Sequence, residues 1–519
     1  MGEIDTNEWS TNSTEATTIS LVRISSNSPG HGLSHVASFK PTYTHQLFGE
    51  QEQIFGYKGL KMDIQVLDHC PLTRIATKFD RKFPKRGDVE ADDIEDIWRE
   101  VLNEDAFVSE KAFSDNAKSL EHQTPAGELC HSQKLSPNSN YEVWHGRLSS
   151  PAIYGSFSAI DFLSPLLIDG GSTITESPDL PSNHRWRIFS VYRKDESTQD
   201  KHSLVAYATV YTLYHFSSGY KPPYIELLKQ DGSKDSQPEG DEPCTRRIAQ
   251  FVVLPSFQNQ GIGQLLYATI FDYYYNDPST KRLIVESPSN DFDDLRDVSD
   301  LVLLHRREKF NSIKIDTSYN PSKQTSKKGK TLGAAVKPSF EKSRMLDMNL
   351  LNELQRDLKM PPRQFQRLIE IHLMSQLPPS VRPTIEPVHI KPTAVDLHQY
   401  RLWSLLVKER LVRQHGDALT ELEHEERIVR LNETLQNVGL DYARLLDRVQ
   451  RVEARTKATE STENTENRKE KRKLGEDNNA RNTITADAST ESKRRKVAKA
   501  TEDSGADTND QKRIVPTRV

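Results

Sequence analysis

The chain has 519 residues, of which 35% are hydrophobic and 28% are charged, and its formal net charge is −5. At about 150 residues per domain this length predicts two to four domains, and the composition is typical of a soluble protein that carries some unfolded sequence. No run approaches the roughly 18 apolar residues of a membrane span. The negative net charge argues against a general nucleic-acid binder.

The cysteines and the amino terminus limit the class of protein and its compartment further. Only three cysteines occur, at positions 70, 130 and 244, and their odd number and wide spacing suit a reducing compartment and exclude a zinc pattern. The amino terminus has no apolar core of the kind that a secretory signal needs. We therefore expect a protein that is not secreted and that holds no metal.

The predicted elements begin with a polar, Ser/Thr-rich stretch, residues 1–20, which we expect to be disordered. From residue 21 to about 310, apolar runs alternate with Gly/Pro turns and amphipathic stretches, which is typical of mixed α and β structure. Within it, the polar insertion 221–243 is expected to be mobile. Residues 319–338 are basic and nearly free of large apolar side chains, which indicates a linker.

The last third of the chain changes character. Helical periodicity over residues 339–455 predicts a small helical region, with one helix closing on Gly416, and we find no chemistry in it. Residues 456–519 lack aromatic side chains and are expected to be disordered. Two basic clusters in this tail, "KEKRK" and "SKRRKVAK", indicate a nuclear-import signal, a nucleic-acid contact or a solvated charge run.

A glycine turn near the middle of the chain carries the most specific signal. A β-rich run, residues 246–254, precedes Gly261 and Gly263, and the apolar residues after them recur at helical spacing until Pro278. The run "KRLIVES" then predicts a second strand. Because unpaired N–H groups and the positive end of the dipole lie at a helix entrance, this turn favours a phosphate or pyrophosphate. Leu266 excludes the dinucleotide fingerprint, and Gln264 excludes a P-loop.

The spacing Gln258-x-x-Gly261-x-Gly263 resembles the (Gln/Arg)-x-x-Gly-x-(Gly/Ala) signature of the GCN5-related acetyltransferase superfamily, although a plain glycine turn fits it too. The surrounding segments "RRIAQFVVLPSFQNQGIGQLLYATI", "LIVESPSNDFDDLRD" and "YTHQLFGEQEQIFGYKGLK" are similar, in order, to the catalytic subunit of type B histone acetyltransferases. The resemblance spans residues 43–297. It implies the α/β (α+β) acetyltransferase fold, with an amino-terminal α/β histone-binding subdomain 21–150 and an acetyl-CoA domain 151–318. Composition and periodicity add a disordered stretch 1–20, a linker 319–338, a helical region 339–455 and a disordered basic tail 456–519.

Lysine acetylation needs a base, because a free lysine with a pKa near 10.4 is only about 0.1% neutral at pH 7.4, a deficit of roughly 4 kcal/mol. Glu286 ends the second predicted strand, and the resemblance implies that it is the general base. It also implies that Asp169 is an auxiliary or lysine-orienting carboxylate. The alternatives are a solvated strand-end glutamate and a turn aspartate. Ser287 stands where relatives typically have aspartate, which puts a pair of adjacent carboxylates in doubt. No cysteine or histidine supports an acyl-enzyme, so direct transfer is expected.

For the co-substrate, the resemblance implies acetyl-CoA and no metal. Backbone groups of residues 251–253 would follow the pantetheine arm, residues 258–264 would wrap the pyrophosphate, and a strand-end amide would polarise the thioester carbonyl. For Asp291 the alternative is a helix N-cap. The implied binding residues are Phe251, Val252, Val253, Gln258, Asn259, Gln260, Gly261, Ile262, Gly263, Gln264, Ser289 and Asp291.

For the acceptor, the resemblance implies the amino-terminal tail of newly made, free histone four. Two segments would touch it, and carboxylates in the first suit a basic peptide. In the second, Tyr211 would cover the lysine stem; the alternatives are a surface loop and a core aromatic. The two segments consist of Glu50, Gln51 and Glu52, and of Tyr211, Thr212 and Leu213.

The resemblance further implies a WD-repeat histone chaperone as partner and a location in nucleus and cytoplasm, with no membrane and no sequence-specific nucleic acid. Two other functions stay open. One is a chromatin or histone-chaperone scaffold that keeps the fold without turnover, which Ser287 favours. The other is an acetyltransferase for amino-terminal amines or small molecules.

Overall fold

The computed structural model describes residues 6–24, 33–120, 124–136, 139–174, 184–195, 201–215, 242–320, 342–386 and 389–457. The chain divides into two compact units, Met1–Leu446 and Asp447–Val519, and the described part of the second, residues 447–457, is helical. Almost all of the insertion 221–243 and of the linker, and the tail from 458 onward with both basic clusters, lie outside the described residues. None of the described helices is both long and apolar enough to cross a membrane.

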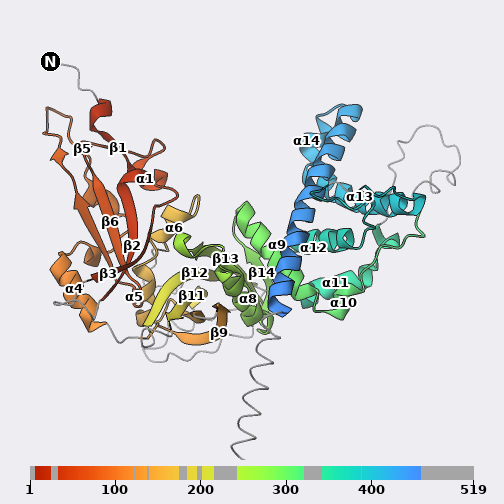
Figure 1. Ribbon diagram of the computed structural model, residues 1–519, viewed down its shortest axis with the longest axis horizontal. Helices are drawn as coiled ribbons and strands as arrows, with labels where there is room; N and C mark the ends of the chain where they lie inside the picture. Colours follow the sequence, from red (N-terminus) through yellow and green to blue (C-terminus); the bar gives the residue numbers. More distant parts are fainter. Residues whose placement is uncertain are drawn as a thin grey trace, which may run out of the picture. The chain divides into compact units, whose positions relative to one another are not determined.

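The amino-terminal part of the first unit is built on a four-stranded sheet with the order β3-β2-β6-β7 (Figure 1). Strands β2 and β6 are parallel, and the other neighbours are antiparallel. The strands of this sheet are β2 (Thr17–Ile24), β3 (Leu33–Phe39), β6 (Lys61–Leu67) and β7 (Thr73–Lys78). Two small pairs join β1 (Ser10–Asn12) to β4 (Gln53–Phe55) and β5 (Tyr57–Lys58) to β8 (Arg81–Lys82). The helices are η1 (Thr6–Trp9), α1 (Ser13–Ala16), α2 (His45–Phe48), α3 (Ile94–Arg99), η2 (Glu104–Ala106) and α4 (Glu110–Ser119).

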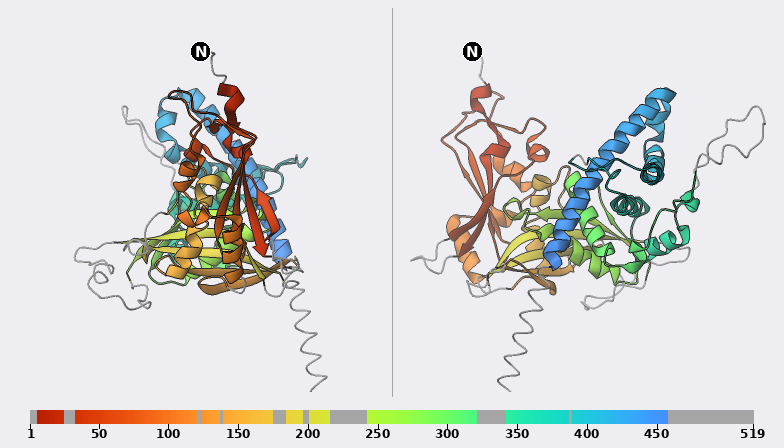
Figure 2. Two further views of the ribbon diagram at one scale, coloured as in Figure 1. Left: turned by 90° about the vertical axis from the view of Figure 1, so that its left-hand side faces the viewer. Right: turned by 45° about the vertical axis from the view of Figure 1, so that its right-hand side comes forward.

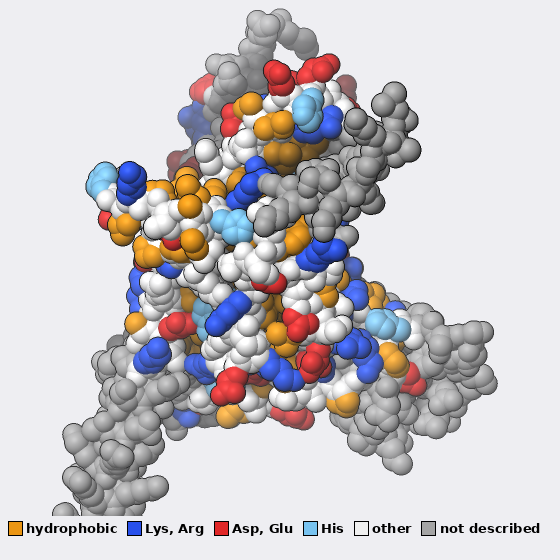
Figure 3. Space-filling model, turned by 90° about the vertical axis from the view of Figure 1, so that its right-hand side faces the viewer, with side chains coloured by type: hydrophobic (Ala, Val, Ile, Leu, Met, Phe, Trp, Pro, Cys, Tyr) orange, Lys and Arg blue, Asp and Glu red, His pale blue; other side chains and the backbone are white. Residues whose placement is uncertain are grey.

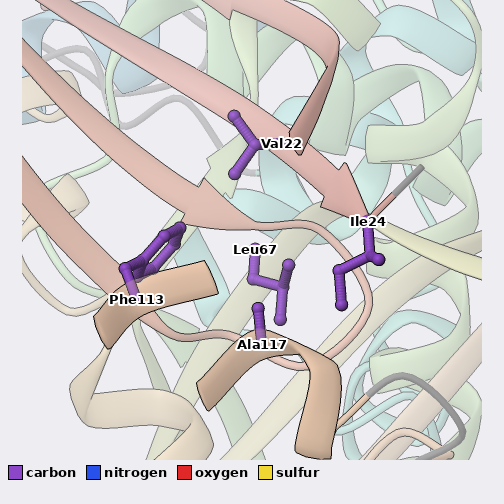
Figure 4. Close-up of a cluster of buried hydrophobic side chains, with 5 residues drawn as sticks. All are labelled: Val22, Ile24, Leu67, Phe113 and Ala117. Atoms are coloured by element: carbon purple, nitrogen blue, oxygen red, sulfur yellow. The ribbon is translucent and has the colours of Figure 1, made fainter. Parts of the chain in front are cut away.

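Helix α4 closes one end of this sheet. Its Phe113 and Ala117 side chains are fully buried against Val22, Ile24 and Leu67 from β2 and β6 (Figure 4). Each large apolar side chain buried in this way contributes about 1.5–3 kcal/mol. The cluster therefore fixes the helix to the strands and gives the amino-terminal part a core of its own.

The expectation that residues 1–20 are disordered is wrong for residues 6–20, which form η1, β1, α1 and the start of β2. Their Ser/Thr hydroxyls find partners within the fold: Ser13 Oγ lies 2.6 Å from Thr44 Oγ1, and Thr17 Oγ1 donates to the Ser13 carbonyl at 2.7 Å. Ile19 is fully buried in the sheet. Composition alone misses such a segment because its hydroxyls replace water with internal hydrogen bonds.

The central sheet has six strands in the order β14-β13-β12-β11-β10-β9. All neighbours are antiparallel except β13 and β14, which are parallel. Figure 2 shows the amino-terminal sheet in red and orange and the central sheet from orange (β9 and β10) through yellow to green. The strands are β9 (Glu128–Ser136), β10 (Ser139–Arg147), β11 (Trp186–Asp195), β12 (Lys201–Tyr214), β13 (Cys244–Val253) and β14 (Thr280–Val285). The helices here are α5 (Pro151–Ser158), α6 (Leu163–Leu167), η4 (Pro255–Phe257), α8 (Ile262–Tyr275), α9 (Asn290–Leu304) and α10 (Glu308–Asn311).

Helices cover both faces of the central sheet. On one face, Tyr273 and Tyr274 of α8 pack edge-on against Phe189 of β11. On the other, Phe157 of α5 packs against Tyr207 of β12. Phe189 pairs with a residue next to Tyr207 in the chain, and successive strand residues point to opposite faces, so α5 and α8 lie on opposite sides.

The carboxyl-terminal part of the first unit is helical, as predicted. It consists of η6 (Lys342–Arg344), α11 (Met348–Asp357), α12 (Pro362–Ser375), α13 (Ala394–Gln414), α14 (Gly416–Thr420) and a helix that begins at residue 424. Helix α13 ends two residues before Gly416, which instead opens α14. On the face in Figure 3, acidic and basic side chains are interspersed with scattered hydrophobic ones.

Lys359, between α11 and α12, attaches this helical part to the central sheet. Its Nζ donates to the carbonyls of Tyr274, Tyr275 and Asp277 at 3.1, 2.7 and 2.5 Å, at the carboxyl end of α8. Its own carbonyl accepts the N–H of Leu283 in β14 at 2.9 Å. A cation that satisfies the last carbonyls of a helix also opposes the negative end of its dipole.

Candidate active site

The parallel strands β13 and β14 separate at one end of the central sheet. Strand β13 pairs with β12 as far as Val253, but with β14 only as far as Ile248, opposite Val285. The N–H of Glu286 makes the last link, donating to the Ile248 carbonyl at 2.9 Å. Among the described residues no strand lies beside 249–253 on this side, so β13 presents an open edge there.

A bulge decides which backbone groups face this opening. The register between β12 and β13 leaves Ala249 as an extra residue. Beyond it, the N–H of Leu254 donates to the carbonyl of Val205 in β12 at 3.0 Å. Because alternate residues of a strand direct their N–H groups to opposite sides, Phe251 and Val253 direct theirs toward the opening. These are two of the residues predicted to follow the pantetheine arm.

The glycine turn leads from this edge into α8. Asn259 and Gly261 both have left-handed backbone, with φ of 61° and 87°, and Gly261 is the N-cap of the helix. Gln258 Nε2 donates to the Val253 carbonyl at 3.0 Å and Gln260 Nε2 to the Ser256 carbonyl at 3.3 Å, which ties the turn to the end of β13. The first N–H groups of α8 have no helical partner and point out of this end. The arrangement fits a pyrophosphate.

Close packing surrounds the second glycine. A Cβ at Gly263 would lie 2.7 Å from Leu295 Cδ1 of α9, so a side chain there would force the Leu295 side chain to move. The Phe251 ring packs edge-on against Phe292 of α9 at 4.9 Å. Ser289, and not Asp291, is the N-cap of α9: its hydroxyl accepts the N–H of Phe292 at 3.2 Å. The N-cap alternative for Asp291 is therefore wrong, and its carboxylate lies in the first turn.

A row of side chains crosses three strands of the sheet and ends at Glu286, directly after β14. The Trp186 and Tyr211 rings lie 4.7 Å apart on β11 and β12, and the Arg247 guanidinium on β13 lies 5.5 Å from the Tyr211 ring. Arg247 Nη1 is 3.1 Å from Glu286 Oε1, and the Glu286 side chain remains 42% exposed. Arg185 Nη1 donates to the Tyr211 hydroxyl at 3.0 Å. The predicted base and one predicted substrate contact are thus brought together through Arg247.

Asp169 lies in a tight turn after α6 and is exposed. Gly170 has left-handed backbone, with φ of 65°, and a Cβ at Gly171 would lie 2.5 Å from the Ser164 carbonyl oxygen. Only glycine fits both positions without strain. The sequence "DGG" therefore fixes where the Asp169 carboxylate leaves the chain.

The Asp169 turn lies on the same face of the sheet as Glu286. Gln250 of β13 reaches the turn by donating to the Ser172 carbonyl at 2.8 Å. Gln250 pairs with Thr209, and Tyr211, two residues further along β12, pairs with Arg247. Because side chains of directly paired residues share a face, and so do those two positions apart on a strand, the turn and the row that ends at Glu286 share one face.

The residues predicted to contact the histone tail fall into two groups: some have exposed side chains, and others have side chains that are engaged within the fold. Glu50 and Gln51 are exposed in the turn after α2. The carboxylate of Glu52 already accepts the N–H and hydroxyl of Thr44 at 2.8 and 3.0 Å, and the Thr44 N–H is the main cause that lowers the pKa of Glu52. Thr212 is buried, with its hydroxyl accepting from Arg246, so its side chain cannot face a substrate. Tyr211 and Leu213 are half-buried.

Sequence reasoning missed Arg247. A strand with two apolar, buried faces rarely carries two adjacent arginines. The pair Arg246-Arg247 in an otherwise β-rich, apolar run could therefore have indicated that at least one of them has a specific role. Arg246 is buried and pairs with Asp277 at 3.0 Å, on the α8 side, while Arg247 points to the opposite face and meets Glu286. The two adjacent arginines thus point to opposite faces of the central sheet, one toward α8 and the other toward Glu286.

The thiol closest in sequence to the site is inert. Cys244 is fully buried, and burial raises the pKa of its thiol. Within the described ranges, no group of three or more His, Cys, Asp or Glu side chains is arranged to hold a metal ion.

A mixed sheet whose two parallel strands separate beside a glycine turn and a helix amino terminus defines an acetyltransferase of the GCN5-related fold. The family described as "Histone acetyl transferase HAT1 N-terminus" matches residues 9–169, and "Fungal HAT1, C-terminal" matches residues 331–378. The chain belongs to the family of type B histone acetyltransferase catalytic subunits.

Curated relatives with the name "Histone acetyltransferase type B catalytic subunit" match most of the chain. The protein of Gibberella zeae is 35% identical over 470 residues, which is 88% of this chain and 94% of the relative. That of Neurospora crassa is 34% identical over 474 residues, 85% and 88% of the two chains. That of Pyricularia oryzae is 34% identical over 495 residues, 93% and 98%.

Proposed function

We propose that this protein, a histone acetyltransferase by family, transfers the acetyl group of acetyl-CoA to lysine side chains in the amino-terminal tail of free histone four. Glu286 is the general base, and transfer is direct within a ternary complex. The observation that carries the proposal is the position of Glu286: it follows the last residue of β14 at the point where β13 and β14 separate, near the glycine turn. A second exposed carboxylate, Asp169, shares its face of the sheet.

Glu286 takes a proton from the ε-ammonium of the bound lysine, which makes the amine a nucleophile. Acetyl-CoA supplies the acetyl group as a thioester: the C–N bond forms at its carbonyl carbon, the C–S bond breaks, and coenzyme A leaves as the thiolate. The second proton on the new amide nitrogen passes to that thiolate, which leaves a neutral amide and the coenzyme A thiol. The lysine ammonium first has to share or displace the contact between Glu286 and Arg247. Asp169 orients the ammonium from the facing turn.

The residues that hold the co-substrate act mostly through their backbone. The N–H groups of Phe251 and Val253 bind the pantetheine arm, with an N–H at this end of β13 polarising the thioester carbonyl. The turn from Gln258 to Gln264 binds the pyrophosphate, supported by the open amino end of α8. Ser289 and Asp291, at the start of α9, complete the site. The buried side chains of Val252 and Ile262 contribute shape only.

The acceptor side is acidic and aromatic. Glu50 and Gln51 are exposed and suit a basic, flexible peptide. Tyr211, flanked by Trp186 and Arg247, covers the aliphatic stem of the lysine. Glu52 and Thr212 act by shaping the backbone of their segments, because their own polar groups are engaged within the fold.

The substrate is tested by coenzyme A release from acetyl-CoA with a histone-four tail peptide. A matched peptide with every lysine replaced by arginine keeps the charge and the free amino terminus but lacks the acceptor amines. We expect turnover with the first peptide and none with the second. Equal turnover with both would favour an acetyltransferase for amino-terminal amines. No turnover with either, even after addition of a WD-repeat histone chaperone, would favour the scaffold.

The pyrophosphate site is tested by Gly261→Ala, which we expect to weaken acetyl-CoA binding about 10-fold. The methyl group strains the left-handed N-cap, by about 1–2 kcal/mol, and narrows the approach to the N–H groups. Gly87→Ala is the matched control, since Gly87 has φ of 62° and open space around a Cβ. Titration calorimetry with acetyl-CoA on both variants separates a local effect on the binding site from the general strain of an alanine at a left-handed glycine position. Equal acetyl-CoA affinities of Gly261→Ala and Gly87→Ala would contradict the proposed pyrophosphate site.

The partner and the location remain part of the proposal. A WD-repeat histone chaperone would bind the protein as a heterodimer, and newly made histone would be met in both cytoplasm and nucleus. The basic clusters of the tail would supply nuclear import.

A further inference from the structure

A buried carboxylate lies behind the Asp169 turn. Asp161, in the segment between α5 and α6, is 6% exposed. Its Oδ2 accepts the N–H of Ile174 at 2.5 Å, and its Oδ1 accepts from Gln250 Nε2 at 3.1 Å. The same Gln250 nitrogen donates to the Ser172 carbonyl at 2.8 Å. Asp161 and Gln250 together therefore hold the two residues that end the turn.

The other end of this bridge is β13. Gln250 stands directly before the residues proposed to bind the pantetheine arm. Its N–H donates to Thr209 Oγ1 at 3.2 Å, and the same hydroxyl lies 3.2 Å from Gln250 Oε1. Each polar atom of the Gln250 side chain is thus committed, which leaves the amide one orientation. The bridge connects the turn that carries Asp169 to the strand that carries the co-substrate site.

Burial of this carboxylate has an energetic cost that its neighbours do not offset. Burial raises the pKa of Asp161 to about 6, against the hydrogen bonds from Gln250 and Ile174. The titratable groups that face it are Tyr154 of α5 and Tyr207 of β12, and the Tyr207 hydroxyl has no hydrogen-bond partner among the described residues. A buried carboxylate whose ionised form costs free energy is typical of a functional constraint.

We propose that Asp161 is a positioning residue for acetyl transfer: through Gln250, Ser172 and Ile174 it fixes the Asp169 turn against β13. This inference rests on the proposed function, because it takes Asp169 to orient the acceptor lysine. Asp161 itself touches neither substrate. Loss of the bridge would free the Asp169 carboxylate to move while leaving the glycine turn and α8 in place.

The test is a double-mutant cycle between Asp161→Asn and Asp169→Asn in the full chain. We expect Asp161→Asn to lower kcat/KM for the histone-four tail peptide about 10-fold, the effect of a small displacement of an orienting group. The double variant should be no slower than Asp169→Asn alone, since both changes remove one function. The affinity for acetyl-CoA should stay within about twofold of wild type.

Thermal unfolding supplies a readout that distinguishes positioning from support of the fold. The pKa of Asp161 lies above the ordinary aspartate value, so its ionisation destabilises the folded state as pH rises through about 6. Asp161→Asn removes that effect, so its Tm relative to wild type should rise between about pH 4 and pH 6 and level off at higher pH, while its activity stays low. Ser164→Ala is the matched control: its buried hydroxyl in α6 has no hydrogen-bond partner within the part of the chain that the structure describes, and neither activity nor Tm should fall.

Each outcome of the double-mutant cycle either supports or overturns the positioning role of Asp161. Multiplicative losses in the double variant, or a parallel loss of acetyl-CoA affinity and Tm, would overturn the inference. If Asp161→Asn does not fold, Gln250→Met breaks the same bridge from the other side and enters the same cycle. Glu286→Gln in the same assay tests the proposed base independently: a fully active Glu286→Gln contradicts the proposed mechanism, while the cycle still decides the role of Asp161.

Discussion

Glu286→Gln is expected to lower kcat for acetyl transfer about 100-fold, in the range that removal of a general base produces. The amide has the size of the carboxylate and can still accept a hydrogen bond from Arg247, but it cannot take a proton from the lysine ammonium. The glycine turn and the open edge of β13 do not involve this side chain. Acetyl-CoA affinity should therefore be unchanged when it is measured by calorimetry beside the rate.

The control for this variant is Glu353→Gln. Glu353 is a half-exposed carboxylate of α11 that pairs with Lys309 at 2.5 Å, so its replacement also removes one charge from an ion pair. An exposed pair contributes about 0–1 kcal/mol to stability, and the rate should not change. A Glu286→Gln protein as fast as Glu353→Gln would place the base elsewhere and would leave the glutamate with a structural role.

Arg410→Met is expected to cost about 3–5 kcal/mol of unfolding free energy, because it leaves a buried carboxylate without its cation. Glu370 of α12 is buried, and Arg410 Nε donates to both of its oxygens at 3.0 and 2.9 Å. Tyr442 donates to the same carboxylate at 2.9 Å, and Trp403 donates to the Glu370 carbonyl. The ion pair thus joins α12 to α13, and the Tyr442 hydroxyl links the same carboxylate to a third helix. Urea unfolding followed by circular dichroism measures the loss of the ion pair.

Arg413→Met, three residues further along α13, is the matched control. Arg413 is 67% exposed and pairs with Glu409 on the same helix, so its loss should cost at most about 1 kcal/mol. Burial raises the pKa of Glu370, so the deficit of Arg410→Met should shrink as the pH falls and the carboxyl group protonates. Similar costs for both variants would contradict the buried pair.

The sequence was most informative where local periodicity decides the structure. The helical face predicted after the glycine turn is the buried face of α8: Ile262, Leu265, Leu266 and Ile270 are all at most 5% exposed. The strands on either side were placed correctly, β13 within two residues of its observed start. Such elements are predictable because one helix or strand carries its own pattern and needs no distant partner.

The rest of the site depends on contacts between residues far apart in the chain. Asp161 and Gln250 are separated by 89 residues, and their contact depends on the register of β12 and β13 and on the bulge at Ala249. No pattern in the sequence encodes that register. The ion pair between Arg247 and Glu286 is of the same kind, since it needs two neighbouring strands to be parallel.

Lys359 and the glycine turn lie at opposite ends of α8. Its ammonium lies at the carboxyl end of this helix, against three carbonyls, while the amino end opens at the glycine turn. Opposite charges at the two ends of one dipole both lower its energy. The helical region thus places a fixed cation at one pole of α8, and an anion bound at the other pole completes a helix neutralised at both ends.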